Sequence, residues 1–213
     1  MTSERLIETL SAELTPVRPR RPSHEVSLLG AIGLIELALL LLLGGARHDL
    51  ASVMMRPSFW WKLGTMGALA AIGLATALRS FDPTRSPRAG LRRAAVAVGA
   101  ALAIGWLLDA THRDALPLAA RMRWHDGVHC MMVMALLSLP MLAGLAVLIR
   151  RSAPTDRRGT ALAAGIAAAA WGAFVFSFVC PHDDPLYVAV WYLAGCSLVT
   201  LAARWLLAPM ARW

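Results

Sequence analysis

Six long apolar segments run through this chain of 213 residues, and they constrain its fold more than any other feature. A helix needs roughly 20 mostly apolar residues to cross the hydrocarbon core of a bilayer. Segments of this length are expected at residues 27–46, 58–78, 93–110, 127–149, 160–180 and 186–207. Hydrophobic residues make up 58% of the chain, whereas soluble domains carry about 45–50%. The sequence therefore predicts an all-α fold, a polytopic bundle of six transmembrane helices in a lipid bilayer.

The basic residues predict the orientation of these segments. The net charge of +8 does not indicate direct binding of nucleic acid, because the basic residues form short clusters between apolar runs. If the N-terminus is cytoplasmic, that side carries Arg5, Arg18, Arg20, Arg21, Arg79, Arg85, Arg88, Arg92, Arg93, Arg150, Arg151, Arg157, Arg158, Arg204 and Arg212. The other side carries only Arg47, Arg56, Lys62, Arg113, Arg121 and Arg123. The positive-inside rule thus predicts a multi-pass protein of the bacterial inner membrane with both termini in the cytoplasm.

A short polar segment precedes the first span and has the pattern of an amphipathic helix. Ser3 is suited to cap this helix. Apolar residues then recur at spacings of three and four and form one stripe, made of Leu6, Ile7, Leu10 and Leu14. The helix ends before Pro16, and at about 12 residues it is marginal alone and needs a partner. Its polar face is acidic, the wrong sign for anionic lipid, so we expect a protein groove; a frayed tail without a role is the alternative.

Prolines and arginines at residues 16–22 follow this helix and favour an extended, semi-rigid spacer. The sequence therefore divides into two parts. Residues 1–25 form a cytoplasmic arm with its spacer, and residues 26–213 form the six-helix transmembrane domain.

Two of the three cysteines are expected to meet. Cys130 begins the fourth span and Cys180 ends the fifth, and both are equally distant in sequence from residue 155, in the loop between these antiparallel spans. Equal rise along both helices places the two thiols at one depth, on the periplasmic side, where a disulfide can form. Cys196 falls near the middle of the last span and is expected only to pack.

Other side chains near the pair could bind a metal. Candidate ligands are His125, His129, Met131, His182 and Asp183. Thiolate, imidazole and thioether groups suit zinc, copper(I) or another soft metal, although no C-x-x-C spacing is present. A redox pair, a metal site and simple packing of buried cysteines and methionines all remain open at this stage.

Glu36 lies near the centre of the first span, where a charged carboxylate costs about 2.5–3.5 kcal/mol on insertion scales. It must be protonated, hydrogen-bonded to a partner or exposed to a wet cavity. A structural hydrogen bond is favoured over an ion-coupling role, because no second carboxylate or intramembrane base accompanies it.

Several segments together resemble the NrsF-like family of integral membrane anti-sigma factors, named for negative regulation of sigma F. The resemblance covers nearly the whole chain and is carried by Leu6-Ile7, Thr15-Pro16-Val17-Arg18-Pro19, Pro57-Ser58-Phe59-Trp60-Trp61-Lys62, Trp124, Cys130, Ser138-Leu139-Pro140, Cys180-Pro181-His182-Asp183 and Trp191-Tyr192. The chain departs from the family at Val179 and Asp184, where a histidine before the second cysteine and a serine shortly after it are common. The resemblance implies an N-terminal segment that sequesters an extracytoplasmic-function sigma factor. It also implies that Cys130 and Cys180 are required for the response to oxidative or metal stress.

The leading hypothesis is therefore a membrane-bound anti-sigma factor that releases its sigma factor when the cysteine pair is oxidised or captures a metal. The alternative is a small metal or ion transporter that uses Glu36, Asp109 and the His/Met/Cys cluster. No nucleophile with a base, multi-ligand metal motif or phosphate loop indicates an enzyme. No cofactor is certain; zinc, copper or another soft metal at the cysteine site is a candidate, and the sequence leaves open whether the chain forms a homo-oligomer.

Overall fold

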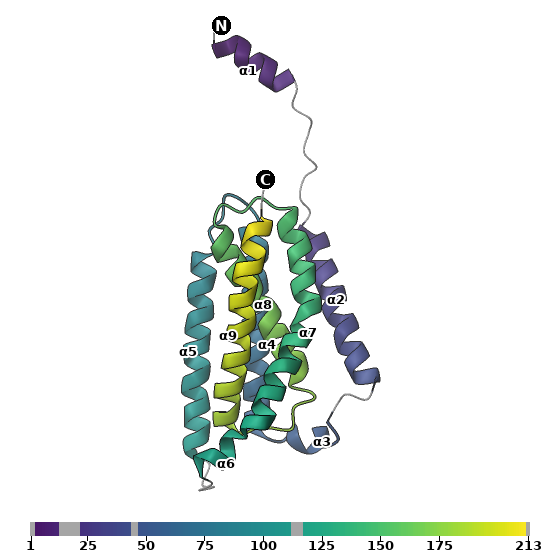
Figure 1. Ribbon diagram of the computed structural model, residues 1–213, viewed down its shortest axis with the longest axis vertical. Helices are drawn as coiled ribbons and strands as arrows, with labels where there is room; N and C mark the ends of the chain where they lie inside the picture. Colours follow the sequence, from purple (N-terminus) through teal and green to yellow (C-terminus); the bar gives the residue numbers. More distant parts are fainter. Residues whose placement is uncertain (1–2, 13–21, 44–46, 112–116, 212–213) are drawn as a thin grey trace.

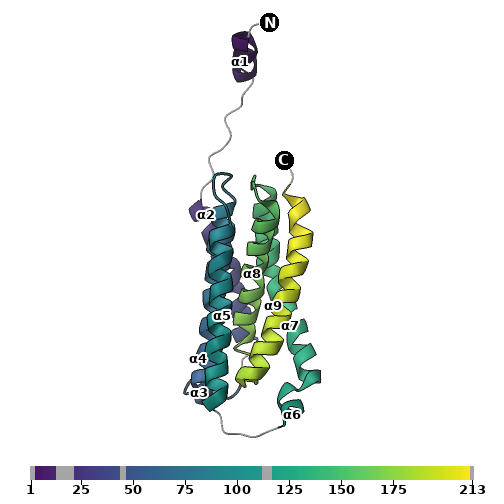
Figure 2. The same cartoon turned by 90° about the vertical axis from the view of Figure 1, so that its left-hand side faces the viewer.

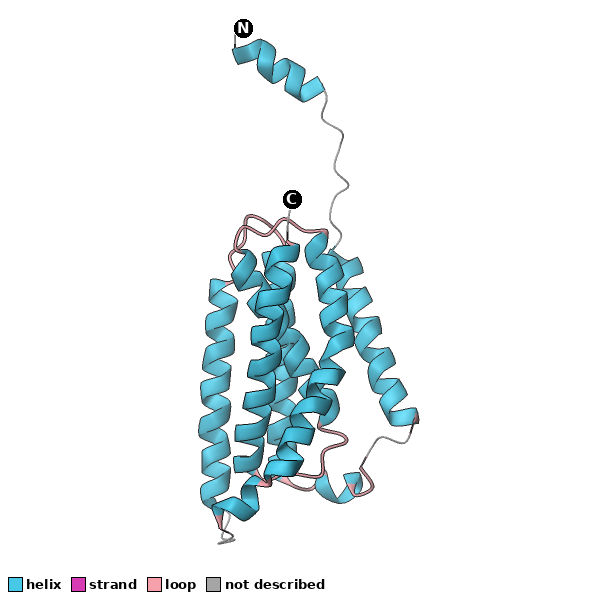
Figure 3. Cartoon of the chain, in the orientation of Figure 1, coloured by secondary structure: helices cyan, strands magenta, loops and turns pink. Residues whose placement is uncertain are grey.

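The computed structural model describes residues 3–12, 22–43, 47–111 and 117–211, and within these ranges the chain is helical with no strand (Figure 3). The predicted all-α class is confirmed. The helices long and apolar enough to cross a membrane are α2 (Pro22–Leu42), α4 (Pro57–Ser80), α5 (Arg88–Thr111), α7 (Trp124–Arg150), α8 (Arg157–Phe176) and α9 (Pro185–Leu207). Each overlaps one of the six predicted segments. Shorter helices are α1 (Ser3–Ala12), α3 (Leu50–Val53), α6 (Leu118–Met122) and the 3₁₀ turn η1 (Ala208–Met210).

Local sequence explains where several of these helices begin. Pro22, Pro57 and Pro185 each stand at the first helical position, where the missing N–H has no intrahelical partner to lose. Asp156 caps α8 by accepting from Gly159 N at 2.9 Å. Pro57 and Pro185 directly precede the predicted starts at residues 58 and 186, whereas α2 begins at Pro22, before the predicted start at residue 27 and within the predicted spacer.

Helix α8 is the centre of the bundle and packs against α4, α7 and α9. Of its most apolar 18 residues 72% are buried, the largest share among the six spans. Small side chains allow this close packing: a Cβ on Gly73 of α4 would lie 2.7 Å from Ala167 N, and Gly165 and Gly172 similarly approach the backbones of α9 and α7. Backbones that approach this closely gain van der Waals contact without a large side chain between them.

The bundle has two chemically different ends (Figures 1 and 2). One end, called here the arginine end, carries the start of α2, the loop from α4 to α5, the loop from α7 to α8, and η1. The other, called here the cysteine end, carries α3, α6 and the loop from α8 to α9. Helix α1 lies apart from the bundle beyond the arginine end in both views.

The apolar stripe of α1 is only partly described. Ile7 is 64% exposed. The side chains of Leu6 and Leu10, and the whole of Leu14, lie outside the described residues. Helix α2, which follows the arm, packs along α7 and leans away from it toward the cysteine end (Figure 1).

The structure corrects the predicted end of the fifth span. Helix α8 ends at Phe176, so Cys180 lies in the following loop and not at the helix end. The physical reason is Pro181, because a residue that precedes proline is sterically disfavoured in the helical conformation. The start of the fourth span was also placed too late, since α7 begins at Trp124 and Cys130 lies in its second turn.

Candidate functional site

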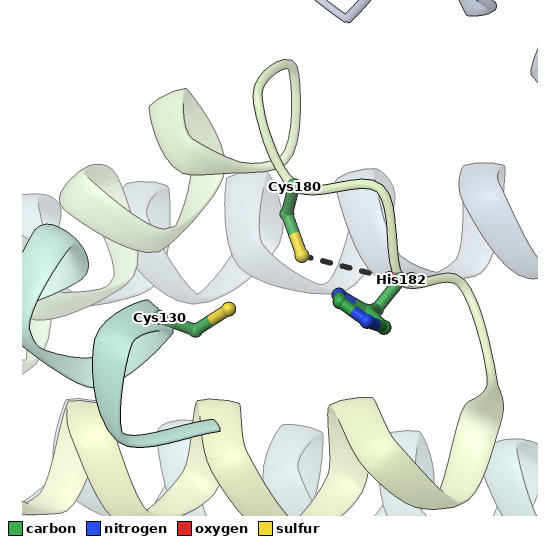
Figure 4. A group of neighbouring side chains, drawn as sticks. All are labelled: Cys130, Cys180 and His182. Carbon is green, nitrogen blue, oxygen red and sulfur yellow. Dashed lines mark hydrogen bonds between the residues drawn. The ribbon is translucent and has the colours of Figure 1, made fainter. Parts of the chain in front are cut away.

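The loop between α8 and α9, residues 177–184, brings the two predicted cysteines together at the cysteine end. Cys130 projects from α7, and Cys180 projects from the loop toward it (Figure 4). Their sulfurs and one ring nitrogen of His182 all lie within 4.8 Å of one another. Cys130 and Cys180 are both buried and both free thiols.

Tyr187, from the first turn of α9, braces this cluster. Its hydroxyl donates a hydrogen bond to Cys130 Sγ across 3.2 Å. Its ring stacks on His182, with the ring centroids 4.5 Å apart. Asp184 fixes the start of α9 by accepting from the N–H groups of Leu186 and Tyr187, and thereby orients the tyrosine toward the cysteines.

The imidazole of His182 has the partners of a metal ligand. Nδ1 is buried and has no hydrogen-bond partner. Nε2 lies 3.4 Å from Asp126 Oδ2 and 3.3 Å from Arg123 Nη1. A carboxylate on the far nitrogen of a histidine is the usual outer-shell support of a metal-binding imidazole. Two thiols and this imidazole fit a soft metal ion such as zinc or copper(I).

A buried ion cluster lies behind the cysteine loop. The carboxylate of Asp183 accepts from Lys62 Nζ at 2.6 Å and from Arg47 Nη1 at 2.7 Å. The side chains are almost inaccessible: Lys62 is 0% exposed, and Arg47 and Asp183 are 5% exposed. Charges removed from water in this way are stable only while each is paired.

The same two cations also hold the backbone of the loop. Lys62 Nζ donates to His182 O at 3.2 Å. Arg47 donates to Cys180 O at 2.9 Å and to Pro181 O at 3.3 Å. Helix α4 and the segment before α3 are thereby joined to the residues that flank Cys180, and the loop is held rigidly where its thiol faces Cys130.

Electrostatics favour a charged sulfur on Cys180. The pKa of its thiol is lowered because Cys130 donates a hydrogen bond to the sulfur and because Lys62 contributes a nearby positive charge, which together outweigh the effect of burial. A thiolate is the form that attacks oxidants and binds metals. Of the two cysteines, Cys180 is therefore the one whose lowered pKa favours the reactive thiolate form.

A cleft of about 910 Å³ leads from the surface to the cysteines. It runs between the first turns of α7 and the loop, and His125 and His129 line it as exposed residues. The cleft brings a metal ion or a small oxidant close to the cysteines, but Cys180 is 0% and Cys130 4% exposed, so contact with the sulfurs requires a local opening of the cleft wall.

Comparison with known proteins identifies the family. The family model described as "Negative regulator of sigma F", named NrsF, matches residues 10–213. The chain belongs to the NrsF family. It is 31% identical over 219 residues to the "Probable anti-sigma-F factor NrsF" of Azospira oryzae, and 28% identical over 215 residues to the "Anti-sigma-F factor NrsF" of Caulobacter vibrioides. Both alignments cover 100% of this chain and 100% of the relative. No solved structure matches the chain.

Membership of the NrsF family confirms the resemblance found in the sequence and the prediction that the chain is a regulator and not an enzyme. Trp191, one of the residues that carry the resemblance to the family, joins the start of α9 to the start of α7. Trp191 donates from Nε1 to Met122 O at 2.8 Å and packs edge-on against Trp124. Gly127 permits this packing, because a Cβ there would lie 2.0 Å from an indole carbon of Trp191.

The structure separates the other residues predicted to bind metal in this NrsF-family chain. Of the described candidates, only His182 joins the two sulfurs, while His125 and His129 lie along the cleft. Asp183 is bound by the two cations of the ion cluster, and Met131 packs against the core. Whether a metal binds remains a prediction.

Two further predicted residues lie away from the cysteine pair. Glu36 accepts a hydrogen bond from Trp171 Nε1 at 2.9 Å and leaves its Oε1 buried without a partner. Cys196, in α9, donates to Ala169 O at 3.7 Å. Asp109, which the transporter alternative also used, pairs with Arg121 at the cysteine end.

Sequence reasoning missed the importance of Arg47, Lys62 and Tyr187. Arg47 lies 133 residues from Cys180, and no spacing rule links them. Lys62 did carry a signal, because a lysine in the first turns of an apolar span needs a counter-ion or an outlet to water. Tyr187 lies within the family segment between Cys180 and Trp191 and was noticed only as an interfacial aromatic residue.

Proposed function

We propose that this chain is an integral inner-membrane anti-sigma factor whose N-terminal segment binds an extracytoplasmic-function sigma factor. On oxidative or metal stress, sensed at Cys130 and Cys180, it releases the sigma factor. The observation that carries the proposal is the convergence of both thiols and His182 within 4.8 Å at the end of the bundle opposite the arm. The printed function of the NrsF relatives supports the sigma-factor part.

The charge distribution supports a cytoplasmic arginine end. The loops there contain Arg85, Arg151 and their neighbours, whereas the described cations of the cysteine end are largely tied up in ion pairs. By the positive-inside rule, the arginine end faces the cytoplasm and the cysteine end faces the periplasm. The arm then lies in the compartment of the sigma factor, and the thiols lie where oxidants and metals arrive.

Both disulfide formation and metal binding at Cys130 and Cys180 should move the loop between α8 and α9. Oxidation joins the two sulfurs in one S–S bond and passes two electrons to the oxidant; with Cys180 as the thiolate, the one proton released is that of the Cys130 thiol. Because a disulfide requires sulfurs about 2.05 Å apart, Cys180 and its loop must shift toward α7. Metal binding likewise displaces thiol protons and draws the two sulfurs and His182 around one ion.

A contiguous set of contacts links this loop to the helix that follows the arm. Phe178, in the turn after α8, packs edge-on against Phe174, which stacks on Trp171 with centroids 5.4 Å apart. Trp171 donates to Glu36 of α2, and a Cβ on Gly33 of α2 would lie 2.7 Å from the same indole. A loop movement that tilts Trp171 changes how α2 packs against α8, and α2 is the helix that follows the arm. This coupling requires the trigger to favour one packing over the other.

The decisive experiment follows sigma-factor binding and the state of the cysteines separately. Wild type, Cys130→Ser, Cys180→Ser and the control Cys196→Ser are treated with hydrogen peroxide or a zinc or copper salt. Before treatment we expect the sigma factor to co-purify with all four proteins. After treatment it should dissociate from wild type and Cys196→Ser and stay bound to Cys130→Ser and Cys180→Ser. Equal release from all four would contradict sensing by the pair.

Charged substitutions in the apolar stripe test whether the arm binds the sigma factor. Leu6→Glu with Leu10→Glu destroys the apolar stripe and should free the sigma factor without any trigger. Glu8→Gln, on the polar face of the same helix, is the matched control and should retain it. Co-purification that survives the double leucine change would show that the sigma factor binds elsewhere.

A further inference from the structure

We propose that a cleft between α4 and α5 at the arginine end binds the phosphate headgroup of an anionic phospholipid. The cleft has a volume of about 570 Å³ and lies beside the loop that joins these two helices. Its polar lining consists of Arg79, Arg85, Arg93, Ser86 and Thr76. The inference depends on the chain lying in a membrane, and it is independent of the anti-sigma role.

The cleft holds more positive charge than its protein neighbours neutralise. Among the described residues, no carboxylate lies within ion-pair distance of Arg79 or Arg93. Arg85 has Asp82 as a partner at 3.8 Å, and both side chains are largely exposed. Guanidinium groups bind phosphate oxygens through two parallel hydrogen bonds, so this surplus fits a phosphate.

The packing of the two helices places the arginines around one space. At Gly90 the helices nearly touch, because a Cβ there would lie 2.1 Å from Thr76 Oγ1. Arg79 follows Thr76 by three residues and Arg93 follows Gly90 by three, so each is about 4.5 Å along its helix axis from the point of contact. Because the helices are antiparallel, the backbone positions of Arg79 and Arg93 lie on opposite sides of this contact along the bundle axis, and both residues line the cleft.

The remaining lining selects a lipid over a free phosphate ion. Ala71, Ile72 and Ala75 of α4 form an apolar wall that continues the cleft toward the middle of the bundle, and Ala89 adds an apolar residue at the arginine end. From Ala71 to Arg79 is about 12 Å along the helix. A headgroup at the arginines would therefore continue as an acyl chain along this wall, whereas inorganic phosphate would leave it uncovered. Basic pockets between transmembrane helices are common sites for anionic lipid headgroups.

The test uses the full chain in nanodiscs of phosphatidylcholine, with or without phosphatidylglycerol, and counts retained lipid by native mass spectrometry. Arg79→Gln with Arg93→Gln is compared with Arg150→Gln with Arg151→Gln, which removes two charges from the same end outside the cleft. We expect wild type and the control to retain phosphatidylglycerol, and the cleft variant to bind it about tenfold less tightly or worse.

Three results would overturn the proposal. One is equal retention of phosphatidylglycerol by the cleft and control variants, with both shown to be folded by their unfolding temperatures. Another is displacement of the lipid by millimolar inorganic phosphate, which would make the site one for a free anion. The last is loss of sigma-factor co-purification from the cleft variant with lipid retention unchanged, which would assign the arginines to a protein partner.

Discussion

Asp183 should be the most sensitive single position for stability at the cysteine end, and Asp183→Asn tests this. The change keeps the volume of the side chain and removes its charge. Lys62 and Arg47 then remain buried, at 0% and 5% exposure, without the carboxylate that both contact within 2.7 Å. The loop backbone stays bound to both cations, of which Lys62 has lost its carboxylate and Arg47 keeps only Asp49.

The expected loss is large because uncompensated charge cannot reach water. Removing one partner of a buried ion pair costs about 3–5 kcal/mol. Since each 1.4 kcal/mol is a factor of ten, the equilibrium constant for unfolding should rise by roughly two to almost four powers of ten. Arg47 keeps Asp49 as a second carboxylate, whereas Lys62 contacts Asp183 alone among the described carboxylates, so the loss is expected to come mainly from the stranded Lys62.

Unfolding in mixed micelles with increasing dodecyl sulfate, followed by tryptophan fluorescence, measures the free energy. Asp49→Asn is the matched control, because Asp49 also binds Arg47 but is 53% exposed, and its loss should matter far less. Lys62→Met added to Asp183→Asn removes one stranded cation and should recover part of the stability. A loss below about 1 kcal/mol for Asp183→Asn, the range of an exposed pair, would refute the reasoning, as would a failure of Lys62→Met to recover any.

Three further outcomes follow from the contacts described. Trp171→Phe removes the N–H that bonds to Glu36; we expect release of the sigma factor on peroxide to fall while cysteine oxidation, measured by thiol labelling, stays at the wild-type level. Because the pKa of Cys180 is lowered, its thiolate should persist as pH falls, so its alkylation, followed by peptide mass spectrometry, should change little between pH 8 and pH 6. An ordinary thiol with a pKa near 8.5 would slow roughly 80-fold over that interval. Gly127→Ala would place a Cβ 2.0 Å from an indole carbon of α9 and should destabilise the bundle by about 1–3 kcal/mol, whereas Gly64→Ala, in open space, should be neutral; unfolding in mixed micelles compares them.

The site was only partly predictable from the sequence. Equal distance from residue 155 correctly placed Cys130 and Cys180 at one end of the bundle, since rise per residue is the same in every helix. It placed Cys180 inside the fifth helix, however, because the apolar run hid the effect of Pro181 on the residue before it. The glycines of α4 also differ in their surroundings: Gly73 lies against the backbone of α8, whereas Gly64 faces open space.

The sequence by itself determined the number, length and order of the apolar helices, the prolines that begin them and the bias of arginine toward one end. These properties depend on residues close together in the chain, where propensity, hydropathy and spacing act directly. Only the tertiary structure decided which side chains surround the thiols. Arg47, Lys62 and Tyr187 come from three separate elements, and they reach one loop because small residues let α8 pack closely against α4, α7 and α9. Contacts of this kind depend on helix rotation and closeness of packing, which no local pattern in the chain encodes.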